Sequence, residues 1–336
     1  MCEATRRAVL FGMIAATAGA AFPLRAQDGS GALLDAARKL SRLNSIAVAI
    51  GGETRLAEAV RGPAVDRPVN VKSVSKTVIA ALTGAAIGKG IIEGVDQPVV
   101  ELLDRSVPDD ADPRVRNITV AHLLTMRAGL ERTSGPNYGR WVQSDDWVRY
   151  ALSRPFVDEP GGRFLYSTGS FHLLSAALTG AAGRSTLDLA RDWLGEPLNI
   201  AIPPWTRDPQ GIYMGGNNMA LSPLAMVRLG ETYRRGGTHD GKRVLTEEWI
   251  SESWVPRTRS PFSGDQYGYG WFITRMGGYD VRYARGYGGQ MIYVVPDLQL
   301  TAAMTSDPTI PARSGSYVGE LRRLLTEQVI PFAEAT

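Results

Sequence analysis

A serine and a lysine at helical spacing are the residues of this chain best suited to chemistry. Ser73 and Lys76 are the first and last residues of the segment Ser-Val-Ser-Lys, and residues three apart share one face of a helix. The positive end of a helix favours a serine alkoxide. A lysine that loses part of its hydration gives up its proton more readily and then serves as a base. The pair therefore indicates covalent catalysis by Ser73 with help from Lys76.

Spacing alone leaves a second interpretation open, in which the serine caps a helix and the lysine is solvated one turn later. Other nucleophiles are scarce, because the sequence has no Gly-x-Ser-x-Gly segment and a single cysteine, Cys2. None of the three histidines, His122, His172 and His239, has a carboxylate beside it in a pattern typical of a triad. With no His-Glu-x-x-His motif either, we expect no catalytic metal and no other cofactor.

The elements that must position this motif follow from the hydrophobic pattern. Apolar residues at helical spacing predict helices over 31–43, 73–86, 120–126, 146–152, 170–182, 187–194, 223–230 and 315–329. Alternating segments between Gly and Pro predict strands over 45–50, 54–60, 69–72, 268–274, 281–285, 290–295 and 299–305. We therefore expect an α+β fold in which 27–96 and 260–336 form one region around a mostly helical region, 97–259.

The first 26 residues are typical of an export signal. Arg6 and Arg7 precede an uncharged run rich in Ala and Gly, and the small residue Ala26 suits cleavage. Adjacent arginines in this position indicate the twin-arginine type. The run is shorter than the ~20 residues of a spanning helix, so we expect removal of the segment without a lasting membrane anchor. The sequence thus predicts a periplasmic or secreted protein.

Charge and composition narrow the class of protein. The chain is 44% apolar and 21% charged, as in ordinary globular proteins. The net charge of +3 falls to +1 without residues 1–26, which carry three arginines and one glutamate. A nearly neutral body gives no reason to expect a nucleic acid as partner.

Four motifs follow one another along the chain, and together they are far more specific than any one of them alone. They are Ser73-Val-Ser-Lys76-Thr77, His122-Leu-Leu-Thr-Met-Arg-Ala-Gly-Leu130, Pro160-Gly-Gly-Arg-Phe-Leu-Tyr166-Ser-Thr168-Gly and Gly286-Tyr-Gly-Gly-Gln290. The set resembles the class C branch of the β-lactamase and penicillin-binding protein superfamily, from about residue 31 to the end. Within it, the chain is most similar to family VIII carboxylesterases and 6-aminohexanoate-dimer hydrolases. The resemblance implies an antiparallel sheet flanked by the terminal helices, with an inserted helical region.

The resemblance also implies roles for the matched residues. Ser73 would be acylated, Lys76 would help to activate it, and Tyr166 would relay protons to and from the serine and the leaving group. A tyrosine with an ordinary pKa near 10 needs neighbouring cations to act as a base at pH 7, and Lys76 is the expected one. The oxyanion hole would combine the amide of Ser73 with that of Gln290, or of Gly289 if the register slips by one.

Two departures from the family pattern bear on the substrate. Thr168 stands where the family has an asparagine that contacts a substrate amide. Tyr287, followed by Gly288, stands where lactam-binding members have a lysine that holds a ligand carboxylate. We therefore expect uncharged acyl or alkyl groups to suit the site better than a penicillin-like carboxylate, unless an arginine such as Arg285 replaces that lysine.

Three further residues are candidates for substrate contact. Tyr138 and Trp141 belong to an aromatic segment that forms a pocket wall in this branch, although ordinary packing would explain them equally well. Asn217 follows two glycines, which allow backbone to approach a ligand closely.

The sequence thus predicts an exported serine hydrolase that cleaves small esters or amides through an acyl-Ser73 intermediate. The alternatives are a β-lactamase or D-stereospecific peptidase and, from a different class, a penicillin-binding-like module without catalytic activity.

Overall fold

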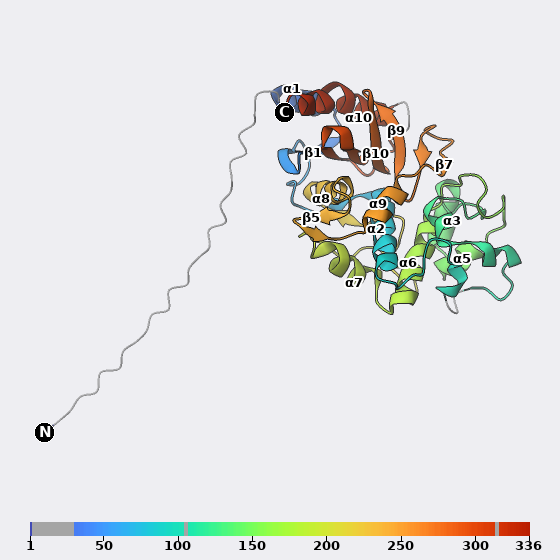
Figure 1. Ribbon diagram of the computed structural model, residues 1–336. Coiled ribbons are helices and arrows are strands. Elements are labelled where there is room, and N and C mark those ends of the chain that lie inside the picture. Colours follow the sequence, from blue (N-terminus) through green and yellow to red (C-terminus); the bar gives the residue numbers. More distant parts are fainter. Residues whose placement is uncertain (2–29, 104–106, 313–315) are drawn as a thin grey trace.

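The computed structural model describes Met1 and residues 30–103, 107–312 and 316–336 (Figure 1). Apart from Met1, the export signal predicted over 1–26 lies outside the described residues. In the described ranges, no helix combines the length and the apolar character needed to cross a membrane.

One eight-stranded antiparallel sheet is built from both ends of the chain, in the order β2-β1-β12-β11-β10-β9-β8-β7. Its strands are β1 Leu43–Ile50, β2 Glu53–Ala59, β7 Thr258–Arg259, β8 Gln266–Tyr267, β9 Phe272–Met276, β10 Tyr279–Gly286, β11 Gln290–Val295 and β12 Leu300–Ser306. The two ends meet where β1 pairs with β12, with Ala47 opposite Ala303. The predicted α+β fold with a sheet shared by both termini is therefore confirmed.

Helices make up most of the regular elements outside this sheet. The α-helices are α1 Ser30–Lys39, α2 Ser75–Gly88, α3 Val120–Leu124, α4 Tyr138–Val142, α5 Trp147–Leu152, α6 Thr168–Ala182, α7 Thr186–Ala190, α8 Pro223–Arg234, α9 Glu247–Ser253, α10 Tyr317–Leu324 and α11 Ile330–Glu334. Short 3-10 turns include η1 Lys72–Val74 and η5 Gly135–Asn137. Two short strands, β3 Val69–Asn70 and β4 Ala220–Leu221, pair with each other beside η1.

The two faces of the sheet are covered by different helices. Thr301 donates a hydrogen bond of 2.6 Å to Glu231 of α8, whereas the hydroxyls of Ser306 and Tyr317 of α10 lie 2.9 Å apart. Side chains alternate between the faces of a strand, so α8 and α10 lie on opposite sides of β12. The terminal helices α1 and α10 lie together on one face (Figure 1).

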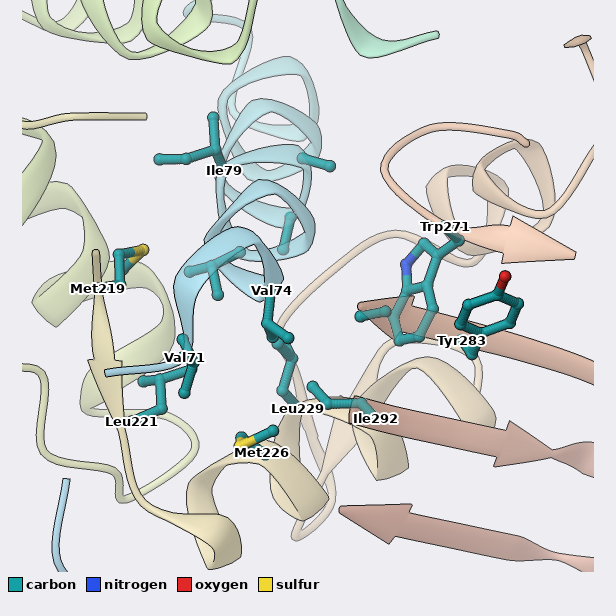
Figure 2. Packing of buried hydrophobic residues seen from close by; sticks show 14 of the residues in the cluster. Val71, Val74, Ile79, Met219, Leu221, Met226, Leu229, Trp271, Tyr283 and Ile292 are labelled. Carbon is teal, nitrogen blue, oxygen red and sulfur yellow. The ribbon is translucent and has the colours of Figure 1, made fainter. Parts of the chain in front are cut away.

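Helix α2 lies in the interior, and every residue from Ser75 to Ala86 is buried. A helix with apolar residues all round is stable only when it is enclosed in this way. Figure 2 shows Val71 and Val74 at its start, in one cluster with Leu229 of α8 and Ile292 of β11. The packing fixes the start of α2 against the sheet.

Some elements differ from those predicted. The helix expected over 73–86 begins with the 3-10 turn η1, and the strand expected over 268–274 begins only at Phe272. The reason for the second difference is Gly270, which has a φ of +75° and accepts a 2.7 Å hydrogen bond from Thr77 of α2. Helices α4 and α9 and the hairpin of β7 and β8 were not predicted.

Candidate active site

Ser73 lies in the turn η1, between the short strand β3 and the helix α2. The preceding residue, Lys72, has a φ of +51°, a left-handed conformation that is unfavourable for a side chain of this kind. Two hydrogen bonds hold it there. Its amide donates to Asn70 Oδ1 at 2.9 Å, and its carbonyl accepts from the Ser75 hydroxyl at 2.5 Å. The backbone at Ser73 is thus fixed from both sides.

The Lys76 amine is enclosed beside Ser73, with only 2% of the residue exposed. Its Nζ atom lies 3.0 Å from Ser73 Oγ, 2.5 Å from the carbonyl oxygen of Gly216 and 3.4 Å from Thr168 Oγ1. No carboxylate of the described chain forms an ion pair with it. Burial without a compensating negative charge lowers the pKa of Lys76 to about 7.

These contacts suit the neutral form of the amine. A neutral amine has two N–H groups and one lone pair, and Gly216 O and Thr168 Oγ1 accept the two hydrogens. The lone pair then faces Ser73 Oγ. The arrangement therefore allows Lys76 to accept the proton of the serine hydroxyl.

Tyr166 is the third member of the cluster. It is partly buried, it forms a side-chain hydrogen bond with Ser73, and Lys76 Nζ lies 4.9 Å from the centre of its ring. Burial raises the pKa of Tyr166, and the hydrogen bond with Ser73 and the positive charge of Arg285 offset only part of this effect. The phenol is therefore protonated at neutral pH, which suits proton donation and relay better than the role of the initial base.

Thr168 contacts the lysine and does not line the cavity. Its hydroxyl lies 2.9 Å from Ser134 Oγ, which also accepts the Thr168 amide at 2.8 Å. The residue that replaces the family's asparagine thus orients Lys76. The sequence had not singled out Ser134 or the carbonyl of Gly216, because no motif marks either group.

A cavity of about 640 Å³ opens beside the nucleophile. It is lined by Ser73, Arg132, Ser134, Gly135, Tyr166, Ser260, Phe262, Ser263, Phe272, Arg285, Gly286, Tyr287, Pro311 and Ala312. Phe262 and Tyr287 are 58% and 51% exposed, so they form an aromatic rim. None of the three histidines is in the lining.

The turn between β10 and β11 carries the residues that are predicted to complete the oxyanion hole. Gly289 donates its amide to Gly286 O at 3.2 Å, within the turn, and it does not line the cavity. Gln290 is buried, and its side chain bonds the backbone of Ser306 on β12. Tyr287 is the member of the turn after Gly286 that lines the cavity. The amide of Gln290, or of Gly289, stays the predicted second oxyanion donor.

Gly286 shows how closely this turn approaches the nucleophile. A Cβ atom at Gly286 would lie 2.3 Å from the carbonyl oxygen of Val71, two residues before Ser73. Gly288 has a different neighbour, because a Cβ there would lie 2.4 Å from Asp307 O. Gly288 thus shapes the turn and is absent from the cavity lining.

The other three predicted substrate contacts are not among the residues that line the cavity. Trp141 is fully buried and donates its indole N–H to the carbonyl of Trp147 at 3.0 Å, so it is a packing residue. Asn217 Nδ2 donates to Tyr138 Oη at 3.1 Å. This pair braces the segment that carries Gly216 O, and neither side chain is in the lining.

Comparisons with known proteins show the family to which the chain belongs. Residues 41–327 match the family model described as Beta-lactamase. The "Probable fimbrial assembly protein FimD, serogroup H1" of Dichelobacter nodosus is 33% identical over 125 residues, 36% of this chain and 31% of that protein. The chain therefore spans about a third of the length of the curated relatives that it matches.

Solved structures show the same fold at low identity. "EstCE1, a hydrolase with promiscuous acyltransferase activity" has a TM-score of 0.71 and 18% identity, covering 88% of this chain and 97% of its own. The D-stereospecific amidohydrolase from Streptomyces sp. has a TM-score of 0.68 and 18% identity, with 88% and 98% covered. With its antiparallel sheet and the match over most of its length, the chain belongs to the β-lactamase family of serine hydrolases.

Proposed function

We propose that this protein is a serine hydrolase that cleaves small esters or amides through an acyl-Ser73 intermediate. The observation that carries the proposal is the buried Lys76 amine, which lies 3.0 Å from Ser73 Oγ and has a pKa lowered to about 7. Such an amine is partly neutral at physiological pH and is already aligned with the hydroxyl that it must deprotonate.

The first half-reaction forms the acyl-enzyme. Ser73 Oγ attacks the carbonyl carbon while its proton passes to Lys76, and the carbonyl π electrons move to the oxygen. When the tetrahedral intermediate collapses, the bond to the leaving group breaks and the leaving group takes a proton from Tyr166. Lys76 then returns a proton to Tyr166, so neither residue is consumed.

The second half-reaction reverses these roles with water. Water attacks the acyl carbon and gives one proton to the neutral Lys76 amine, directly or through Tyr166. The bond between the acyl carbon and Ser73 Oγ then breaks, Oγ takes the proton back from Lys76, and the acid leaves. In both steps the charge on the carbonyl oxygen needs donors. We assign these to the amide of Ser73 and, on the turn after β10, to that of Gln290 or Gly289.

Thr168 and Tyr287 support ester or amide hydrolysis over the two enzymatic alternatives, β-lactamase and D-stereospecific peptidase. Thr168 is engaged with Lys76 and does not face a substrate amide, and Tyr287 supplies no ammonium group. A panel of aryl esters, D-amino-acid amides, aminohexanoate dimer and a chromogenic cephalosporin separates these activities.

A fluorophosphonate probe should form one covalent adduct, on Ser73, because this hydroxyl lies 3.0 Å from the Lys76 amine and also lines the cavity. Ser73→Ala should abolish labelling and lower kcat for a p-nitrophenyl ester by at least about 1,000-fold. Ser153→Ala, at an exposed serine of the same chain, should change neither. Peptide mass spectrometry that finds the adduct elsewhere would refute the assignment, and no adduct with no turnover would favour the non-catalytic module.

The pH dependence of kcat/KM for a neutral aryl ester should follow Lys76. Since the neutral amine is the base, the rate should rise with pH, pass a midpoint near 7 and level off above it. At pH 6 it should be about tenfold below the plateau, because about one amine in ten is neutral there. Lys76→Met should remove this activity, whereas Lys89→Met, at the exposed end of the same helix, should retain it. A profile flat from pH 5 to 9 would contradict the role of Lys76.

We also propose export to the periplasm or beyond, on the basis of Arg6, Arg7 and the uncharged run after them. The mature protein should begin after Ala26, and replacing both arginines with lysine should leave the precursor inside the cell. N-terminal sequencing of the fractionated protein tests this, and an exported protein that retains residues 1–26 would contradict it.

A further inference from the structure

The charge of the cavity points to one kind of substrate. Arg132 and Arg285 both line it, and none of the described lining residues is an aspartate or a glutamate. We propose that Arg132, which belongs to none of the four motifs, makes this site prefer esters or amides that carry a carboxylate in addition to the scissile group. This inference rests on the proposed hydrolase function and names the substrate class within it.

Arg132 lacks the acidic partner that an arginine beside a cavity would ordinarily have. The neighbouring carboxylate, that of Glu131, is already paired with Arg154. Arg132 is partly buried, and its guanidinium lies 5.7 Å from the ring centre of Phe262 at the rim of the cavity. In the part of the chain that the structure describes, its side chain has no ion pair or hydrogen bond. A guanidinium can hold a carboxylate through two parallel hydrogen bonds.

Arg285 brings a second positive charge close to the reacting groups. It belongs to β10, directly before Gly286, and its Nη2 atom donates to the carbonyl of Ala312 in the cavity wall at 2.8 Å. Its charge acts on Tyr166 and offsets part of the rise in the pKa of that phenol. Arg285 thus influences the catalytic tyrosine as well as the cavity, which makes Arg132 the better residue for testing substrate recognition alone.

The two arginines come from distant parts of the sequence, one shortly before η5 and one on β10. Both line the same cavity. They supply the positive charge that Tyr287 does not. The expectation that the site favours uncharged groups rested on Thr168 and Tyr287, and it raised Arg285 only as an alternative source of positive charge. With Arg132 added, the balance of charge in the cavity favours an anion.

Two esters of equal chain length test the inference: the mono-p-nitrophenyl ester of adipic acid, which carries a free carboxylate, and p-nitrophenyl hexanoate, which does not. Both release the same leaving group. For the native enzyme, kcat/KM should be at least about tenfold higher for the adipate ester, within the ten- to 150-fold that a hydrogen bond to a charged group provides.

Arg132→Gln should remove most of this preference by lowering kcat/KM for the adipate ester about tenfold or more, while the hexanoate value stays within about twofold. Arg132→Lys should keep part of the preference, because the charge remains and the paired hydrogen bonds are lost. The matched control is Arg140→Gln, at an exposed arginine on α4 that is not in the cavity lining, and it should leave the ratio of the two rates unchanged.

Equal rates for the two esters, with Ser73 still labelled by the fluorophosphonate, would overturn the carboxylate inference and leave the hydrolase function standing. An Arg132→Gln enzyme that loses activity equally on both esters would also overturn it, because Arg132 would then support the structure and not the recognition of charge. Turnover of neither ester, without labelling of Ser73, would overturn the proposed function together with the inference.

Discussion

The site depends on one lysine side chain that the fold removes from water. Lys76 is enclosed with no negative charge to compensate it, and burial therefore penalises its protonated form. Two oxygens, from Gly216 and Thr168, accept its hydrogens and direct its lone pair at Ser73. The same burial that lowers the pKa of the lysine raises that of Tyr166. Desolvation thus separates the two groups into a base and a proton donor.

The rest of the fold keeps this enclosure in place. Helix α2 is buried from Ser75 to Ala86, so it can begin at only one position relative to the sheet. The pairing of β1 with β12 joins the two ends of the chain in one sheet. In this sheet β10 lies against η1, so the turn after β10 is close to the nucleophile. Because Gly286 has no side chain, that turn approaches Val71 closely enough to form one wall of the cavity.

Local patterns predicted the parts of the site that are local in sequence. The strands β10 to β12 and the trio Ser73, Lys76 and Tyr166 follow from short motifs and alternation, and the structure brings the trio together. Contacts between residues that are far apart in the sequence had no such signal. The carbonyl group that accepts a hydrogen bond from Lys76, for example, lies 140 residues away in the sequence. Nor does sequence show which face an aromatic residue occupies. Trp141 was expected at the cavity and instead packs in the interior.

The titration of Lys76 itself tests the account most directly. The chain has only five lysines, Lys39, Lys72, Lys76, Lys89 and Lys242, so ¹³C-lysine labelling gives few Cε signals, and the Lys76→Met enzyme identifies the relevant one. The account predicts that this signal titrates with a midpoint near pH 7. A Lys76 signal that remains that of a charged amine up to pH 9 would contradict the central claim that the fold holds this lysine ready to act as a base.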